Sequence, residues 1–519
     1  MPLLDELLAL GYFPKELPPA FSTNSYANAV VANLQSLPAT FRQAQWVRPA
    51  SFTLAKASGL RRRLTIVNPV PYFSLADLVA THWATLQPHL MSSPLSLSNP
   101  VSDPNGARAL VPATGLADLI SKRAQNRSSG KYTVVADISE FYPSIYTHTI
   151  PWAFHGKAVA KLNINNQALL GNVLDRWTRI GQEGQTVGIP IGPDTSLVLA
   201  ELVLTAVDTE YAQRITGHHG FRWMDEFEMS FKDFNSAESA LAELQHVLAD
   251  YELRLNPRKT KIEDAPFGFE PRWVSEIRDF QFSPSPKKFG NELARYFDLV
   301  FAHAKELPHE HIVRYALGRL RPWKLDPTNW LLYQQLISHA TIHQFQVVDQ
   351  YITNLLLGQQ EGHVVDLALA GDALNYVIEK TALLEQHHET SWALWGVLSL
   401  GVQLSVEARD RIEKTDNPVI SILALDALQQ GLVPNGFPAA PWSSHMTTSE
   451  LHGEQWLLAY EANKKGWLPS LGATDHVNSE LNFAFLKGAG VEFYTPVTRP
   501  TPPPLSILGV PPVLGAQSA

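Results

Sequence analysis

Residues 131–146, KYTVVADISEFYPSIY, decide the fold of this chain. The β-branched run Thr133, Val134 and Val135 predicts a strand that ends at Asp137. A strand holds its terminal carboxylate on a rigid element, which is a common way to position a metal ligand. Asp137 is therefore the first candidate for a catalytic residue.

Residues 221–231, FRWMDEFEMSF, read as two strand arms around a tight turn, which predicts a hairpin with Asp225 and Glu226 at its tip. If the hairpin joins the same sheet as the first strand, these two acids converge on Asp137. Converging carboxylates repel one another unless a hard cation such as Mg²⁺ or Mn²⁺ neutralises them. Each acid taken alone is more typical of a turn or a helix cap, so only the combination indicates a metal site.

The order of strands and helices predicts an α+β fold with helices on one face of the sheet. Helical patterns cover 149–178, 197–215 and 235–253, and a turn followed by a strand covers 254–264. Beyond about residue 290 nearly every segment up to about 490 is an amphipathic helix. This predicts an all-α domain, open to interpretation as a helical-repeat array although no fixed period is evident.

Four segments follow from this pattern. We expect an N-terminal extension at 1–44, an α+β domain at 45–290, an all-helical domain at 291–494 and a flexible Pro-rich tail at 495–519. The stretch SPSPKKFGNE (283–292) is interpreted as the linker between the two large domains.

The composition excludes several classes of protein. The 519 residues include no cysteine, so a disulfide framework, a thiolate zinc site and a cysteine nucleophile are excluded. The first residues do not resemble a signal peptide, and no apolar run approaches the ~20 residues of a membrane span. We therefore expect a cytoplasmic protein without membrane association.

The net charge of −9 is unevenly distributed. Basic and acidic residues balance over 1–290, so the whole −9 falls in 291–519. Eleven basic and three acidic residues lie within 42–131, which gives this segment a charge of +8. Such a segment is either an ordinary solvated surface or a wall that faces phosphates.

These stretches together resemble the conserved blocks of reverse transcriptases. ADISEFYPSIY (136–146) is similar to the first palm block, GIPIGPDTS (188–196) to the second, FRWMDEFEMSF to the third, LRLNPRKTKI (253–262) to the fourth, and RRRLTIVNP (61–69) to a fingers block. The phrase GYFPKELPPAF (11–21) and the appended helices resemble the bacterial abortive-infection and unknown-group enzymes of phage defence. The resemblance implies a right-hand fold of fingers and palm, and a bacterial RNA-directed DNA polymerase.

The resemblance also implies roles for single residues. Asp137, Asp225 and the backbone carbonyl of Ile138 would bind metal, and Glu226 stands where the family usually has a second aspartate. Tyr142 would be the steric gate against a 2′-hydroxyl, with core packing as the alternative. Further expected roles are nucleotide binding by Gly188, Pro190, Gly192 and Lys259, phosphate contacts by Arg61, Arg62, Arg63, Arg108 and Arg123, and priming by the hydroxyl of Tyr26.

Three hypotheses for function remain open. The first is an antiphage DNA polymerase that works without a template and extends a protein hydroxyl. The second is a template-directed enzyme that copies a dedicated non-coding RNA. The third is a degenerate palm that serves as a phage-sensing binding protein. The expected partners are dNTPs, a DNA product, an RNA template under the second hypothesis, and further copies of the chain in a homo-oligomer.

Overall fold

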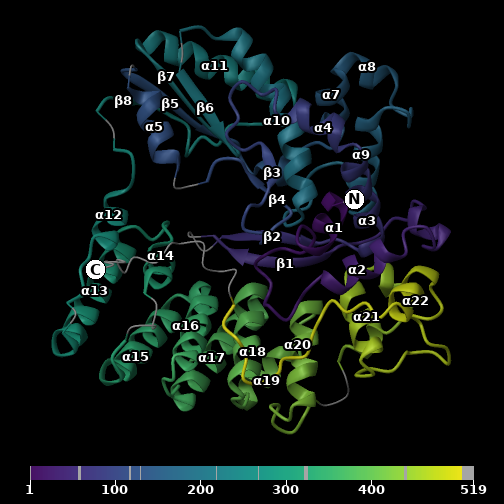
Figure 1. The fold of residues 1–519 in the computed structure, drawn as a ribbon, viewed down its shortest axis with the longest axis vertical. Helices are drawn as coiled ribbons and strands as arrows, with labels where there is room; N and C mark the ends of the chain where they lie inside the picture. Colours follow the sequence, from purple (N-terminus) through teal and green to yellow (C-terminus); the bar gives the residue numbers. More distant parts are fainter. Residues whose placement is uncertain are drawn as a thin grey trace.

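The main sheet is built from the stretches that the sequence singles out. Its strands are β5 (Tyr132–Asp137), β6 (His219–Trp223), β7 (Glu226–Phe231) and β8 (Lys261–Asp264). They are antiparallel in the order β6-β7-β5-β8, and Asp137 lies opposite Glu226 (Figure 1). The predicted α+β fold is therefore confirmed.

The computed structural model describes residues 2–504, apart from 57–59, 116, 117, 129, 218, 267, 284, 321–324 and 438–440. Most of the expected flexible tail, residues 505–519, lies outside this described part. Within the same part of the chain, no helix is both long and apolar enough to cross a membrane.

The two faces of the main sheet differ in polarity because side chains alternate along each strand. Val134 and Met229 lie opposite each other on the apolar face, and α11 (Phe234–Asp250) packs against their strands. The other face carries Asp137, and α5 (Leu119–Arg127) covers part of it. The expectation of helices on one face only was wrong, because α5 supplies arginines that pair with the acids of β7.

Two small hairpins lie between the main sheet and the C-terminal helices (Figure 1). They consist of β1 (Ala50–Ala55) with β2 (Arg61–Ile66), and of β3 (Pro100–Ser102) with β4 (Leu110–Pro112). The remaining helices up to residue 278 are α1 (Pro2–Ala9), α2 (Asn24–Ala32), η1 (Ala39–Arg42), α3 (Pro69–Thr81), α4 (Trp83–Leu90), α6 (Phe141–Ser144), α7 (Thr149–His155), α8 (Lys157–Leu162), α9 (Leu170–Ile180), α10 (Asp194–Arg214) and α12 (Arg272–Arg278).

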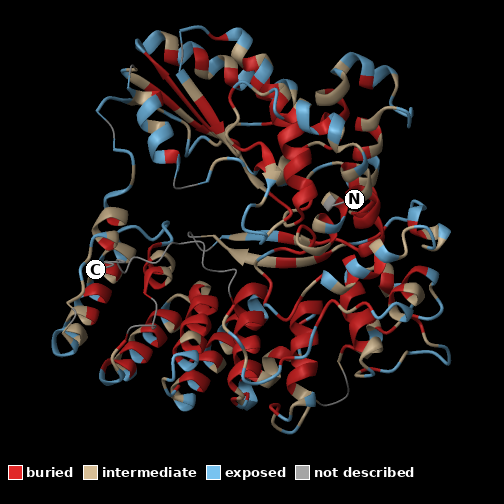
Figure 2. Ribbon diagram, viewed as in Figure 1, coloured by how far each residue is buried: buried red, intermediate tan, exposed pale blue. Residues whose placement is uncertain are grey.

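The described chain from residue 286 to 488 is mainly helical, as predicted. Figure 2 shows that the buried residues of these helices lie mainly on their inward faces. The helices are α13 (Pro286–Glu306), α14 (Ile312–Arg319), α15 (Pro327–His343), η4 (Phe345–Val347), α16 (Val348–Gln360), α17 (Leu367–Thr381), η5 (Ala382–Leu384), α18 (His387–Leu400), α19 (Val406–Ile412), α20 (Pro418–Gln429), η6 (Ser443–His445), η7 (Glu450–His452), α21 (Trp456–Lys464) and α22 (Leu481–Gly488).

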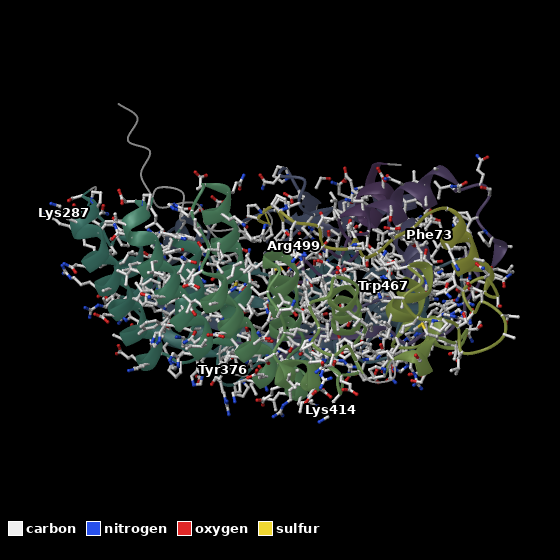
Figure 3. The ribbon with its side chains drawn as sticks, turned by 90° about the horizontal axis from the view of Figure 1, so that it is seen from below. Phe73, Lys287, Tyr376, Lys414, Trp467 and Arg499 are labelled. Carbon is white, nitrogen blue, oxygen red and sulfur yellow. The ribbon has the colours of Figure 1, made fainter. Side chains whose placement is uncertain are left out.

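Helices α13 to α20 form two layers. In one layer α14, α16, α18 and α20 contact each other in turn, and α18 also contacts β1. In the other layer α13, α15, α17 and α19 do the same. The helices of this second, outer layer begin at residues 286, 327, 367 and 406, so successive helices start 41, 40 and 39 residues apart. Figure 3 shows the row from below, from Lys287 past Tyr376 to Lys414.

Local signals explain where several of these helices begin. The side chain of Asp326 accepts a hydrogen bond from the N–H of Thr328 (2.9 Å), and Pro327 occupies the first position of α15. Asn417 and Pro418 begin α20 in the same way. Such caps satisfy backbone N–H groups that have no partner within the helix, and proline presets the helical φ.

The expected linker and domain boundary differ from the structure. Helix α13 begins at Pro286, so residues 286–292 form its first turns, and a boundary at residue 290 would divide the helix. The prolines of SPSPKKFGNE were interpreted as linker residues. Pro286 instead occupies the first helical position, where its missing N–H costs nothing.

The beginning of the expected tail is part of the packed structure. The N–H of Thr495 donates to the carbonyl of Ala20 (2.9 Å), and the N–H of Val497 donates to the carboxylate of Asp426 (2.9 Å). The prediction of a flexible segment from residue 495 was therefore wrong for 495–497. The same contacts join the N-terminal extension to the last helices.

Candidate active site

Asp137 and Asp225 lie next to each other at one end of the main sheet. Asp137 is the last residue of β5, and Asp225 lies in the two-residue turn between β6 and β7. The N–H of Ile138 donates to the backbone carbonyl of Asp225 (3.1 Å) and so joins the end of β5 to this turn. The structure thus brings together the two aspartates that the sequence pattern suggested.

The turn that carries Asp225 has a strained backbone. Met224 adopts a positive φ of +54°, which is uncommon for a residue with a side chain. Two contacts hold it there: its N–H donates to the hydroxyl of Ser98, and its carbonyl accepts from the Arg222 guanidinium (2.7 Å). These contacts fix the direction in which Asp225 projects.

Arg222 belongs to a buried ionic cluster beneath the turn. Its guanidinium, which is fully buried, contacts the carboxylates of Glu201 (2.9 Å) and Asp208 (2.8 Å) on α10. The hydroxyls of Ser96 and Ser93 donate to the same two carboxylates (2.9 and 2.6 Å). Each of the three charged side chains therefore has an ion-pair partner in the core, and each carboxylate also accepts a hydrogen bond from a serine, as buried ions require.

The sequence interpretation missed this cluster, although two signals were present. Glu201 and Asp208 are seven residues apart on an otherwise apolar helix, which places them on one face. Arg222 precedes the hairpin turn in a strand whose neighbours are aromatic. Two acids on the buried face of a helix require a buried cation, and Arg222 is a candidate on these grounds.

The two aspartates influence each other electrostatically. Burial raises the pKa of Asp225, and the negative charge of Asp137 raises it further, whereas the charges of Lys259 and Arg62 oppose this shift. The ammonium of Lys259 lies 2.8 Å from Oδ2 of Asp137, and the Asn256 amide donates to Oδ1 (3.2 Å). Lys259 thus contacts one of the two candidate catalytic carboxylates in this structure.

The contact with Asp137 stabilises the charged form of Lys259. Partial burial disfavours the ammonium, but the hydrogen bond and charge of Asp137 outweigh burial and raise the pKa of Lys259. The expected position beside a triphosphate stays a prediction. The lysine is close enough to the carboxylates to exchange Asp137 for a phosphate as its partner.

Glu226 takes part in a different interaction from the two aspartates. Its carboxylate accepts a hydrogen bond from the Arg123 guanidinium (3.3 Å). Arg123 also contacts Glu228 (3.1 Å), which is almost completely buried. Glu226 therefore helps to attach α5 to β7, and this arrangement does not support the expected catalytic role.

The available oxygen donors fit a divalent cation bound by two carboxylates. The described residues contain no cluster of three or more His, Asp or Glu side chains that could hold a metal ion. Asp137 and Asp225 supply two carboxylates, and the carbonyl of Ile138 accepts no hydrogen bond from any described residue. Mg²⁺ commonly binds one or two carboxylates and completes its coordination with water and substrate phosphates.

Tyr142 lies one short loop beyond Asp137. Burial raises its pKa, and the charges of Glu201 and Asp225 raise it further, so the phenol remains neutral near the aspartates. Its backbone carbonyl accepts a hydrogen bond from the N–H of Ile189 (3.0 Å), which joins it to the loop of the second palm block. This placement is compatible with the expected steric gate.

The loop of the second palm block depends on its glycines. Gly188 has a φ of +87°, and a Cβ there would lie 3.2 Å from the carbonyl oxygen of Pro143. Gly192 has a φ of +135°, and a Cβ would lie 2.6 Å from Cγ of Pro14. Pro190 between them is buried. The N-terminal extension therefore packs against this loop, and its expected nucleotide contacts stay predictions.

Arg108 forms structural contacts in this region instead of projecting toward phosphates. Its guanidinium pairs with the Asp194 carboxylate and donates to the carbonyls of Phe13 (2.7 Å) and Gly192 (2.9 Å). Asp194 also accepts from the N–H of Leu110 (3.0 Å). Each nitrogen of the Arg108 guanidinium donates to a protein oxygen, so this conformation does not support the expected phosphate contact.

Three of the other arginines that were expected to contact phosphates form hydrogen bonds or ion pairs with protein groups. Arg61 pairs with the buried Glu389 of α18 (2.7 Å), Arg63 donates to the hydroxyl of Ser51 (2.8 Å), and Arg123 binds the acids of β7. Arg62 makes no ion pair with any described residue, yet its charge partly opposes the rise in the pKa of Asp225. Among the five arginines, Arg62 and Arg63 are exposed and make no ion pair with a described residue, so these two remain candidates for a phosphate contact.

The structure argues against priming by Tyr26. Its side chain is fully buried against Tyr12 and Phe493, and its hydroxyl donates to the carbonyl of Pro69 (2.7 Å). Burial raises its pKa far above the usual value, which disfavours the nucleophilic phenolate. A hydroxyl in this position cannot reach a nucleotide without unpacking the N-terminal segment.

Comparisons with known proteins found a family match, and solved structures of low similarity. Residues 82–325 match the family described as reverse transcriptase (RNA-dependent DNA polymerase). Solved structures with some similarity include apo telomerase from Candida tropicalis truncated from the C-terminal domain, at 13% identity and a TM-score of 0.29, over 46% of this chain and 54% of that one. Telomerase from Candida albicans in complex with a fragment of telomeric RNA has 11% identity and a TM-score of 0.31, over 78% and 66%. No curated protein matches.

The family match covers less than half of the chain, 244 of 519 residues. Within residues 82–325 the chain is similar to reverse transcriptases, which are RNA-dependent DNA polymerases. The match includes both aspartates and extends through α14, and in this chain the helices from α15 onward follow it. The chain spans 54% and 66% of the lengths of the two telomerase structures.

Proposed function

We propose that this chain is a DNA polymerase of the reverse-transcriptase type that transfers nucleotides from dNTPs. The observation that supports it most is the convergence of Asp137 and Asp225, from separate elements of one sheet, within the matched domain. Burial and mutual repulsion raise the pKa of Asp225, which a bound cation would reverse. The proximity of the two carboxylates therefore disfavours the protein without a cation and favours the binding of a metal ion.

The proposed reaction assigns a separate task to each group. Asp137, Asp225 and the Ile138 carbonyl hold Mg²⁺, with Mn²⁺ as the alternative. The bound cation supplies positive charge for the attacking hydroxyl and for the leaving pyrophosphate. Lys259 moves from Asp137 to the phosphates of the nucleotide, and Tyr142 excludes a 2′-hydroxyl by contact.

The biological setting is also a proposal. The stretches at 11–21 and 137–157 and the appended helices are similar to enzymes of the abortive-infection and unknown-group branch, which supports a role in bacterial antiphage defence. The two-layered helices, with outer helices 39 to 41 residues apart, support a helical-repeat array. We propose that this array mediates homo-oligomer formation.

The alternatives differ in how synthesis begins. Untemplated, protein-primed synthesis and the copying of a dedicated RNA require the same palm. The buried position of Tyr26 disfavours that residue as a primer, so a protein primer would be another hydroxyl. Sequencing the DNA made by the purified protein separates the two modes, because copying yields one defined product and untemplated synthesis yields random or homopolymeric product.

Defence against phage provides the test of the third alternative. A strain that carries Asp137→Ala and Asp225→Ala loses protection if polymerisation is the active function. Retained protection in that strain would support a phage-sensing binding protein with a degenerate palm. A strain with Asp298→Ala, an exposed position on α13, serves as the matched control and keeps protection.

A further inference from the structure

Residues 491–497, which follow α22, join the helical domain to the N-terminal segment. On the side of the helical domain, the N–H of Phe493 donates to Oε1 of Glu461 on α21 (2.6 Å), a carboxylate that is fully buried. On the side of the N-terminal segment, the N–H of Ser22 donates to the carbonyl of Phe493 (3.0 Å). Figure 1 shows α21 and α22 beside α2. Phe493 is therefore bonded through its backbone to both parts of the chain.

The ring of Phe493 makes aromatic contacts with the same two parts. It is fully buried, and its centroid lies 5.3 Å from that of Trp456 and 5.8 Å from that of Tyr460 on α21. It also lies 5.7 Å from Phe13 and 5.5 Å from Tyr26 in the N-terminal segment. Aromatic rings bury large areas and pack in preferred geometries, so their removal shifts the neighbours that they contact. The position of Phe13 consequently depends on Phe493.

Residues 11–14 lie directly against the loop of the second palm block. The N–H of Asp194, which follows this loop, donates to the carbonyl of Gly11 (2.8 Å). Pro14 occupies the space beside Gly192, where a Cβ would lie 2.6 Å from the Cγ of the proline. Contacts this close leave the loop little freedom to move independently of residues 11–14.

The same loop is joined to Tyr142, whereas the two aspartates are held by other contacts. The N–H of Ile189 donates to the carbonyl of Tyr142 (3.0 Å). Burial raises the pKa of Tyr142 most, and nearby carboxylates that include Asp225 raise it further, which places the phenol near the catalytic pair. The hairpin turn that carries Asp225 is held by Arg222, and the printed contacts of Arg222 do not involve residues 11–14. A shift of the loop can therefore move Tyr142 without moving the aspartates.

We propose that Phe493 is a positioning residue for nucleotide binding. Through Phe13 it holds residues 11–14 against the loop at 188–194, and so it sets the position of this loop and of Tyr142. The helical domain thereby contributes to the nucleotide site without contacting the nucleotide. The inference rests on the proposed function, in which Tyr142 contacts the sugar of the incoming dNTP.

Phe483 on α22 offers a matched control for Phe493. It is also fully buried, and its ring packs on the same two residues of α21, Trp456 at 6.5 Å and Tyr460 at 5.6 Å. Within the described residues its aromatic contacts do not include residues 11–14. If Phe493 only stabilises the core, substitution of either phenylalanine by alanine has the same effect on nucleotide binding.

The first measurement is steady-state incorporation of the dNTP that the original protein uses fastest. Phe493→Ala is expected to raise the KM for this dNTP about tenfold and to keep kcat within about threefold, because binding is weakened while the metal ligands stay in place. Phe483→Ala is expected to leave both constants within about threefold of the original values. Phe493→Leu retains most of the buried volume, so its KM rises only about threefold. This variant decides the test if Phe493→Ala does not fold.

The second measurement is hydrogen exchange of the full chain in EDTA, which requires no activity. The amide of Asp194 is expected to exchange about tenfold faster in Phe493→Ala than in the original protein and to be unchanged in Phe483→Ala. An equal rise of KM in both alanine variants, or unchanged exchange at Asp194 in Phe493→Ala, would overturn the inference. Failure of the polymerase proposal is distinguishable, because it abolishes incorporation by the original protein while the exchange measurement still tests the support of the loop.

Discussion

The carboxyl group of Asp225 occupies an unfavourable position when no cation is bound. Burial and the neighbouring Asp137 both raise its pKa, so the charged form costs free energy in the folded protein. Groups that are arranged for catalysis in this way often reduce stability. A substitution of Asp225 is therefore expected to change catalytic activity and the free energy of unfolding in opposite directions.

We predict that Asp225→Asn removes activity while raising stability. The amide relieves the repulsion from Asp137, so the free energy of unfolding at pH 7 in EDTA rises by about 1 kcal/mol. Incorporation of dNTPs falls by about three orders of magnitude, because a metal ligand is lost. Urea unfolding and a steady-state incorporation assay measure the two effects. Asp298→Asn at an exposed position changes neither, and a destabilised Asp225→Asn protein would contradict the account.

We predict that Glu226→Gln retains most of the activity, within about tenfold of the original rate, because Glu226 contacts Arg123 instead of the aspartates. The ion pair is partly exposed, so its loss costs only about 0.2–1 kcal/mol. The incorporation assay compares this variant with Asp225→Asn. Equal loss of activity in both variants would show that Glu226 is a metal ligand.

At the scale of the elements, the hairpin of β6 and β7 depends on the charge cluster beneath it. Arg222 is fully buried between Glu201 and Asp208, and it also holds the carbonyl of Met224. The removal of one partner from such a cluster leaves the others charged and buried, which costs about 3–5 kcal/mol.

We predict that Arg222→Met lowers the free energy of unfolding by about 3–5 kcal/mol and reduces incorporation as well. A triple variant, with Glu201→Met and Asp208→Leu added, regains stability because no unpaired charge remains. Its activity stays low, because the turn at Met224 still lacks the Arg222 contact. Urea midpoints and incorporation rates of the two variants test this. An unchanged midpoint in Arg222→Met would refute the structural role of the cluster.

Local patterns were sufficient to predict β5, the hairpin and the helical character of the second half. The strand at Tyr132–Asp137 follows from a β-branched run, and the turn at Asp225 from two alternating arms. The roles of the arginines could not be predicted in this way. Arg61 pairs with Glu389, which is 328 residues away, and no local signal reports such a contact. The charge of segment 42–131 consequently predicted more phosphate contacts than the structure supports, because several of its arginines pair with protein carboxylates.

At the scale of the whole molecule, one interface joins the helical domain to the β1–β2 hairpin. Nδ1 of His387 accepts hydrogen bonds from the N–H of Thr53 and from the amide of Asn417 (both 3.2 Å). Protonation of Nδ1 would break both bonds. Burial lowers the pKa of His387 to about 4, and the charge of Arg61 contributes to this shift.

We predict that His387 makes the interface sensitive to acid. The folded pKa of about 4 lies below the unfolded value of about 6.5, so the unfolded chain binds the proton more readily. Stability is therefore lost as the pH falls from about 6.5 toward 4, by up to about 3 kcal/mol. Urea unfolding between pH 7.5 and 4.5 measures this slope. His387→Gln is expected to flatten it, whereas the exposed His246→Gln leaves it unchanged; an equal slope in both variants would exclude His387 as the cause.

The most direct test of the central claim is nucleotide incorporation by the purified full-length chain. Labelled dNTPs are supplied with Mg²⁺, with and without a primer and an RNA template, and with prior nuclease treatment. The account predicts incorporation by the original protein, its loss in EDTA, and its loss in the Asp137→Ala/Asp225→Ala variant. No incorporation under any of these conditions, or equal incorporation by the double variant, would contradict it.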